Sequence, residues 1–219
     1  MIGAFLAFSL FWTQPANAGP IVQFNFSDSN AVVDVIDGNL TSTNFLAGGG
    51  LSNIGFAGNA AARGWNPSNT AAIALGAGDY WDFTVTAKTG YQFDLSGITF
   101  DAWRGSSGPV TLQLANCINC GPTWSGALFG PAITVTTSSA NQSVGLVAND
   151  ITSVRIRVVA WSASNNGNNA QLFLDNLILN GAVEQIPVAP LVTPEPASML
   201  LLGTGLAGLA AHRRRRARA

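Results

Sequence analysis

Asp79-Tyr-Trp-Asp-Phe-Thr-Val-Thr-Ala87 is the most informative segment for predicting the fold. In an extended chain its apolar and polar members fall on opposite faces: Trp81, Phe83, Val85 and Ala87 against Tyr80, Asp82, Thr84 and Thr86. Alternation of apolar and polar residues with a period of two predicts a β-strand with one face buried and the other exposed to solvent. Similar runs recur along the chain, at residues 21–26, 31–36, 95–103, 110–115, 132–136, 153–161 and 171–179.

Turn-forming residues separate these runs. Glycine, asparagine and proline gather at residues 48–50, 105–109, 121–122 and 164–169, where they supply positive φ or end a ladder. Short strands joined by polar turns predict an all-β domain over residues 19–180, an antiparallel two-sheet β-sandwich with a jelly-roll-like arrangement. Residues 38–70 leave three interpretations open: a long loop, a short helix near 57–62, or further strands.

The front of the chain has the pattern of a secretory signal peptide. Residues 2–12 are apolar, and Ala16 and Ala18 form an A-x-A cleavage site, so residues 1–18 are expected to be removed and the mature chain to begin at Gly19. No Lys or Arg precedes the apolar run, which departs from the usual pattern. The alternative is a buried helix.

The far end has three parts in a fixed order. Pro194-Glu195-Pro196 is stiff and non-helical, residues 197–211 are uncharged and rich in Leu, Ala and Gly, and Arg213, Arg214, Arg215 and Arg216 form a basic cluster. An apolar run followed by arginines predicts a membrane segment with its basic end in the cytoplasm. The run falls short of a comfortable span of ~20 residues, a deficit that snorkelling arginines could make up, so we expect a temporary transmembrane anchor.

This layout closely resembles the PEP-CTERM sorting signal of Gram-negative envelope proteins, here over residues 194–219. The resemblance implies export, cleavage at or beside the motif by an exosortase of the inner membrane, and release to the cell surface or the medium. It also implies an association with exopolysaccharide and biofilm. The alternative is an ordinary tail anchor. Residues 181–193, punctuated by proline, are expected to form an extended linker ahead of the signal.

The charge of the body argues against nucleic acid as a partner. Residues 19–193 carry five basic and ten acidic side chains, a net charge of −5. Binding to phosphates needs an excess of basic side chains, and the composition of this segment does not provide one.

Catalytic signatures are missing from the body. The one histidine, His212, lies in the C-terminal signal, so the body cannot form a Ser-His-Asp triad, a Cys-His pair or a histidine zinc site. Glycoside hydrolysis uses two carboxyl groups, and the Asp79–Asp82 and Asp94–Asp101 pairs have no spacing that marks them as catalytic. We therefore expect no enzyme activity.

Cys117-Ile-Asn-Cys120 is the one covalent candidate. Outside the cytoplasm a small-ring disulfide is favoured over free thiols and over redox catalysis.

A softer resemblance lies in Leu172-Phe-Leu-Asp-Asn-Leu-Ile-Leu179, which looks like the closing strand of jelly-roll carbohydrate-binding modules. In some of these an aspartate of this strand holds a structural calcium with oxygens from the first strand. The matching residue is Asp175, with Asn25 or Asp28 as partners. The alternative is a surface aspartate without an ion.

Aromatic rings on a β-face can stack on sugar rings while polar neighbours bond the hydroxyls. Trp81 and Trp161 are expected in the core by their pattern. The candidates for glycan contact, beside glycine-rich loops or on a solvent-facing strand side, are Trp65, Trp103, Trp124, Arg155 and Arg157. The sequence therefore favours a non-catalytic extracellular matrix or surface protein that binds a glycan, with a matrix-degrading enzyme and a purely structural or adhesive protein as alternatives.

Overall fold

The computed structural model describes residues 19–65, 67, 70–121, 123–165, 170–188 and 196–216. The expected signal peptide, Pro194 and Glu195 lie outside these residues. The chain divides into two compact units, Met1–Ile186 and Pro187–Ala219. The body is the described part of the first unit, and the helix α2 belongs to the second.

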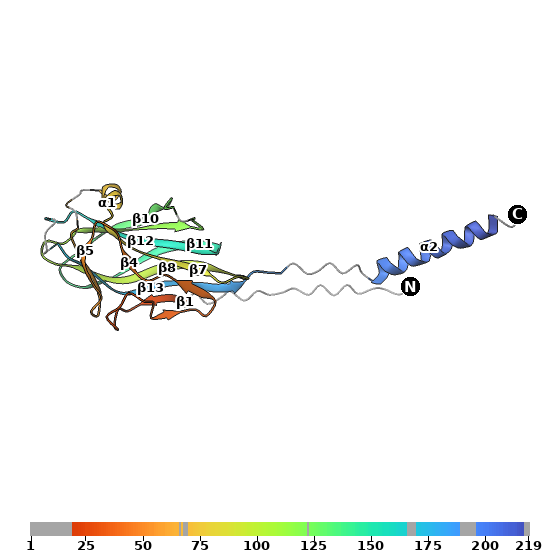
Figure 1. Cartoon of the computed structure of the whole chain (residues 1–219), viewed down its shortest axis with the longest axis horizontal. Coiled ribbons are helices and arrows are strands. Elements are labelled where there is room, and N and C mark those ends of the chain that lie inside the picture. Colours follow the sequence, from red (N-terminus) through yellow and green to blue (C-terminus); the bar gives the residue numbers. More distant parts are fainter. Residues whose placement is uncertain are drawn as a thin grey trace. The chain divides into compact units, whose positions relative to one another are not determined.

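Two antiparallel sheets form the body, as the alternating runs predict (Figure 1). The first sheet has the strand order β11-β8-β13-β1-β2. In addition, β6 pairs with β13, and β5 pairs with β6. Its strands are β1 (Gly19–Phe24), β2 (Val35–Ile36), β5 (Ser52–Gly55), β6 (Ala60–Arg63), β8 (Tyr91–Arg104), β11 (Ala140–Ile151) and β13 (Leu172–Gln185). The second sheet has the strand order β10-β9-β12-β7-β3, and β4 also pairs with β7. Its strands are β3 (Leu40–Ser42), β4 (Leu46–Ala47), β7 (Tyr80–Ala87), β9 (Thr111–Ile118), β10 (Ala127–Thr134) and β12 (Ser153–Trp161).

The core fills the space between the sheets. In β7 the apolar alternates Trp81, Phe83 and Val85 are each no more than 1% exposed, and the Phe24 and Phe83 rings, one from each sheet, meet edge to face with centroids 5.0 Å apart. Burying such a side chain contributes about 1.5–3 kcal/mol. The all-β sandwich is thus confirmed.

Strand β13 is the centre of the first sheet. It pairs with β8, β1 and β6 and runs on to Gln185, with Glu184 opposite Gln92. The expected linker at residues 181–193 therefore begins too early. The pairing with the long strand β8 keeps residues 181–185 in the ladder although their sequence lacks clear alternation.

Two local predictions need correction, and one open question is resolved. Of the run at residues 31–36, only Val35–Ile36 forms a strand. Of the three interpretations of residues 38–70, the one with further strands is confirmed, because β3, β4, β5 and β6 lie there. No helix forms at residues 57–62, where Ala60–Arg63 is strand β6. Strand β11 is absent from the predicted runs: its first residues, Ala-Asn-Gln-Ser, are mostly polar, and most of the strand is exposed.

The short helix α1 (Ala71–Ala77) covers part of the outer face of the second sheet. Thr70 caps its start by accepting the Ile73 N–H, and Gly78 ends it in the left-handed region at φ 85°. Ala71 and Ala74 pack with Val159 and Trp161 of β12 in a second, smaller cluster, which Trp124 also joins. The outer face of this sheet is therefore partly covered by its own connections.

Helix α2 (Pro196–Arg216) holds the apolar run and the arginines of the C-terminal signal. Leu200, Leu201 and Leu202 are each at least 67% exposed. Across the described ranges, none of the helices combines the length and apolar character that crossing a membrane requires.

Candidate functional site

An aromatic pair stands on the outer face of the first sheet. Trp103 of β8 and Phe173 of β13 are direct register partners, with nearly parallel rings, 8° apart, and centroids 5.2 Å apart. Their neighbours Ala102, Leu172 and Leu174 are buried in the core, so alternation turns the two rings outward. Both rings are half-buried. We call this pair the aromatic platform.

Polar groups continue the same face beyond the platform. Asp101 and Asp175 stand two residues along from Trp103 and Phe173 and are also register partners. Asn141 of β11 donates from Nδ2 to Asp101 Oδ1 at 3.2 Å, and Asn176 donates from Nδ2 to Asp101 Oδ2 at 2.8 Å. Both asparagines are exposed. The platform is therefore followed by a row of hydrogen-bonding carboxylate and amide groups.

Backbone geometry holds Asn176 in this row. The residue has a φ of 47°, in the left-handed region that asparagine tolerates better than most residues. The register of β13 against β8 shifts between Asp175 and Ile178, as in a β-bulge, which commonly re-aims a side chain. The bulge puts the Asn176 amide beside Asp101 although the two residues are not register partners.

Asp175 has an acidic environment. Burial raises the pKa of its carboxyl group, the nearby charges of Asp101 and Asp34 raise it further, and the Asn176 N–H lowers it. That N–H donates to Asp175 Oδ1 at 2.8 Å. The carboxyl thus takes up a proton more readily than an ordinary aspartate does.

The calcium predicted at Asp175 has Asn25 or Asp28 as its expected partners. The charges of Asp101 and Asp34 act on Asp175, and the Asn25 N–H donates to Asp34 Oδ2 at 2.5 Å. Calcium takes six to eight oxygen ligands. A structural calcium here stays a prediction.

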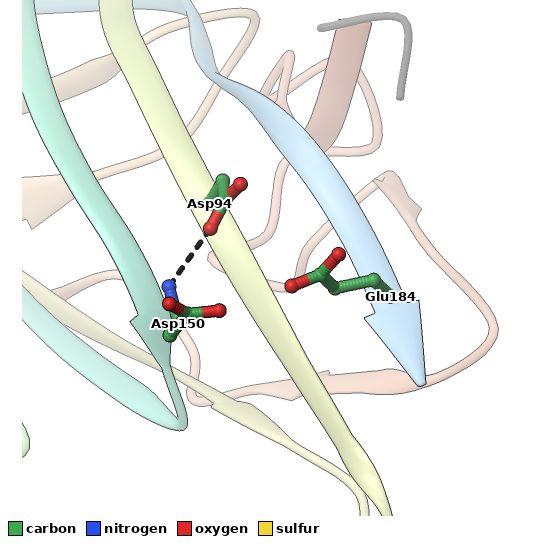
Figure 2. A group of neighbouring side chains, drawn as sticks. All are labelled: Asp94, Asp150 and Glu184. Carbon is green, nitrogen blue, oxygen red and sulfur yellow. Dashed lines mark hydrogen bonds between the residues drawn. The ribbon is translucent and has the colours of Figure 1, made fainter. Parts of the chain in front are cut away.

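A different group of acids gathers within the described residues. Asp94 of β8, Asp150 of β11 and Glu184 of β13 each offer an oxygen within 4.8 Å of the others, as Figure 2 shows. Asp94 Oδ1 accepts the Asp150 N–H at 2.8 Å, and the Gln92 amide donates to both Asp150 and Glu184. Oxygen donors of this kind suit calcium, but the Gln92 amide already bridges two of the three carboxylates.

The second sheet carries the predicted arginines in a different setting. Asp82 of β7 accepts hydrogen bonds from both Arg155 and Arg157. The Arg157 guanidinium lies between the Tyr80 ring, 3.9 Å away, and the Trp124 ring, 4.0 Å away. The expectation that both arginines face solvent is wrong for Arg157, which is 7% exposed. The loop residue Trp124 folds over it.

Burial has an electrostatic consequence for Arg157. It lowers the pKa of the guanidinium, and the positive charge of Arg155 acts in the same direction, whereas Tyr80 and Asp82 raise it. Cation–π contacts and the Asp82 pair stabilise the charge. Arg157 is therefore a fixed structural cation, with its faces occupied by two rings.

Cys117 and Cys120 form a disulfide in the structure. It closes the turn at the end of β9, where Asn119 has a φ of 50°. The Asn119 side chain accepts the N–H groups of Thr152 and Ser153. Ser125, next to Trp124, has its hydroxyl 3.3 Å from Cys117 Sγ. The turn and the segment that carries Trp124 are thus tied to the second sheet.

The tryptophan candidates separate by burial. Trp65 is fully buried and donates from Nε1 to Ala62 O at 3.0 Å, so its assignment to glycan contact is wrong. Trp81 lies in the main core and Trp161 in the smaller cluster. Trp103 is half-buried on the first sheet, and Trp124 is half-buried in a loop that packs on the second sheet. The sequence did not single out Phe173, although its place between the buried Leu172 and Leu174 turns it outward.

The carboxylate pairs considered for catalysis are engaged elsewhere. Asp82 holds two arginines, and Asp79 is 1% exposed. Asp94 belongs to the acidic group and Asp101 to the amide network. Neither pair forms a shared site.

Comparisons with known proteins bear mainly on the C-terminus. Residues 192–216 match the PEP-CTERM protein-sorting motif, as the resemblance predicts. The motif marks the chain for export and for processing by an exosortase. No curated protein matches the chain.

Solved structures similar to the body are carbohydrate-binding modules, the class that residues 172–179 resemble. A mutant family 29 module has a TM-score of 0.41 and 12% identity, covering 76% of this chain and 93% of its own. A CBM4 structure has a TM-score of 0.40 and 13% identity, covering 73% and 84%. Similarity this remote carries no argument about a ligand.

Proposed function

We propose that the mature protein is a non-catalytic extracellular or cell-surface protein that binds a glycan of the exopolysaccharide or biofilm matrix through the aromatic platform. The sorting motif at residues 192–216 supports export. We further propose that α2 holds the precursor at the inner membrane until an exosortase cuts near residues 194–196.

The platform is the observation that carries the glycan assignment. The two rings stack on each other, and the parts of them that stay exposed on the sheet face can pack against the apolar faces of sugar rings. The Asp101 carboxylate and the Asn141 and Asn176 amides stand next to them and can exchange hydrogen bonds with hydroxyls. This combination of apolar rings and oriented polar groups is typical of small-ligand sites.

A glycan array probed with the body tests this function, with and without calcium. Trp103→Ala removes one ring and should weaken binding by about 1–2 kcal/mol, roughly ten-fold for each 1.4 kcal/mol. Phe173→Ala should have a similar effect. Tyr91→Ala, which removes an aromatic ring from the far end of β8, is the matched control and should bind like the wild type.

The results separate the alternatives. If Trp103→Ala binds glycan as tightly as the wild type, the binding site lies elsewhere and the proposal is contradicted. A folded body that binds no glycan favours the structural or adhesive protein. Release of shortened polymer would favour the matrix-degrading enzyme.

A further inference from the structure

We propose that the second sheet carries a separate binding site for a carboxylate-bearing sugar unit, such as a uronic acid, in the cleft beside Arg155. The cleft has a volume of about 270 Å³ and is lined by Thr84, Cys117, Cys120, Gly121, Ser153 and Arg155. It lies on the other sheet from the aromatic platform. The two sites are therefore tested independently.

Strand register builds the floor of the cleft. Arg155 of β12 is the direct partner of Thr84 on β7 and of Cys117 on β9. A hydroxyl, a guanidinium and one sulfur of the disulfide thus form a row across three neighbouring strands. These positions are fixed by the ladder and by the disulfide, so the cleft is preorganised.

The Arg155 guanidinium presents a free edge. Its Nε and Nη2 both donate to Asp82 Oδ2, whereas Nη1 has no hydrogen-bond partner among the residues that the structure describes. Asp82 does not line the cleft and Arg155 does. A guanidinium has a second edge, made by Nη1 and Nη2, that fits the two oxygens of a carboxylate. This edge would bind the carboxylate in the cleft.

Local charge favours an anion. Two guanidinium groups share the single carboxylate of Asp82, and none of the lining residues is acidic. This excess of positive charge stands out because residues 19–193 carry a net charge of −5. Arg155 is also 5.8 Å from the Trp124 ring centroid, and its side chain is 29% exposed, so it is held in place and still reachable.

Two hydroxyls extend recognition beyond the carboxylate. The hydroxyls of Thr84 and Ser153 make no hydrogen bond to another residue in the described part of the body, and both line the cleft. The disulfide adds an apolar wall. The volume of about 270 Å³ is below the roughly 300–1,000 Å³ of sites for drug-sized ligands, which suits a single sugar unit.

Titration of the body, residues 19–188, with glucuronate, glucose and sulfate tests the proposal by calorimetry. The body forms a compact unit with its own core. We expect saturable binding of glucuronate and binding of glucose and sulfate that is at least about ten-fold weaker, because each lacks either the planar carboxylate or the ring. Arg155→Gln should weaken glucuronate binding by about ten-fold or more.

Controls separate this site from a general charge effect and from the platform. Arg63→Gln removes the same charge from β6 of the other sheet, and Trp103→Ala disrupts the platform. Neither should change glucuronate affinity. Thr84→Val keeps the Arg155–Asp82 pair and removes one hydroxyl, so it should weaken binding several-fold and provides a test if Arg155→Gln does not fold.

Three results would overturn the proposal: no saturable binding of glucuronate by the folded body, equally tight binding of glucose or sulfate, or unchanged affinity in the folded Arg155 and Thr84 variants. Each of them leaves the platform on the first sheet untouched, because its test uses different residues.

Discussion

At Arg157, alternation within β12 predicts the correct face but not its environment. Val154, Ile156 and Val158 point inward. Arg155 and Arg157 therefore point outward, as alternation predicts. That outer face is covered by Trp124 and α1, which reach it from distant parts of the sequence. A strand pattern describes the two sides of a sheet and contains no information on which loop returns to cover one of them.

Asp82 should be the most sensitive polar residue of the second sheet. Replacement by Asn removes the charge that pairs with Arg155 and Arg157, and leaves a buried guanidinium without its counter-ion. We expect the free energy of unfolding to fall by about 3 kcal/mol, in the range for breaking a buried ion pair. Urea denaturation measures it, with the exposed Asp28→Asn as control; equal effects of the two changes would contradict this account.

Asp175 should make stability depend on pH in a defined direction. Its pKa is raised in the folded protein, so the folded state binds the proton more tightly than the unfolded state, and stability falls as pH rises through the window above the ordinary aspartate pKa. Asp175→Asn removes this penalty. The free energy of unfolding of the variant minus that of the wild type should therefore be larger at pH 7 than at pH 3.

Urea denaturation of both proteins at the two pH values measures this difference. If the difference in stability between the Asp175→Asn variant and the wild type does not change with pH, or changes in the opposite direction, the assignment of a raised pKa is refuted.

At the scale of elements, the strands that combine alternation with aromatic or β-branched residues could be predicted, and β7, β8, β9 and β12 are of this kind. The edge strand β11 could not, because most of its residues are exposed and its register on β8 shifts between Gly145 and Ile151, which interrupts the alternation. Strands β3 to β6 are two to four residues long, too short for a period to be recognised. Tertiary pairing decides such segments.

The close approach of β13 and β8 makes Gly181 a critical position. A Cβ atom there would lie 2.0 Å from the carbonyl oxygen of Asp94, so Gly181→Ala must push the two strands apart. We expect a loss of about 1–3 kcal/mol in the free energy of unfolding, as for other overpacked sites. Gly145→Ala in β11, where the added atom meets nothing within 4 Å, is the matched control, and a Tm equal to that of the control would count against the register of β13 on β8.

For the candidate site, the sequence indicated Trp103 and the Asp175 strand but not their combination. The platform forms because β8 and β13, separated by more than sixty residues, are register partners. Asn176 reaches Asp101 only through the bulge after Asp175. Neither the pairing of distant strands nor a bulge has a signal in a single sequence.

At the scale of the whole molecule, we propose that the two ends determine where the body goes. The motif at residues 192–216 marks the chain for export, and the front resembles a signal peptide. Intact-mass analysis of the protein secreted by its native host should therefore find Gly19 first and no Arg213–Arg216 at the other end. Recovery of the arginine cluster on the mature surface form would show that the C-terminal segment is a permanent anchor.

The proposed function of the whole molecule depends on the platform. The most direct test is co-sedimentation of the body with the insoluble extracellular polysaccharide of its native host, with Trp103→Ala and Tyr91→Ala measured in parallel. We predict saturable retention of the wild type and of Tyr91→Ala, and about ten-fold weaker retention of Trp103→Ala, corresponding to about 1.4 kcal/mol. Equal retention of all three proteins, or no retention of the folded wild type, would contradict glycan binding at this face.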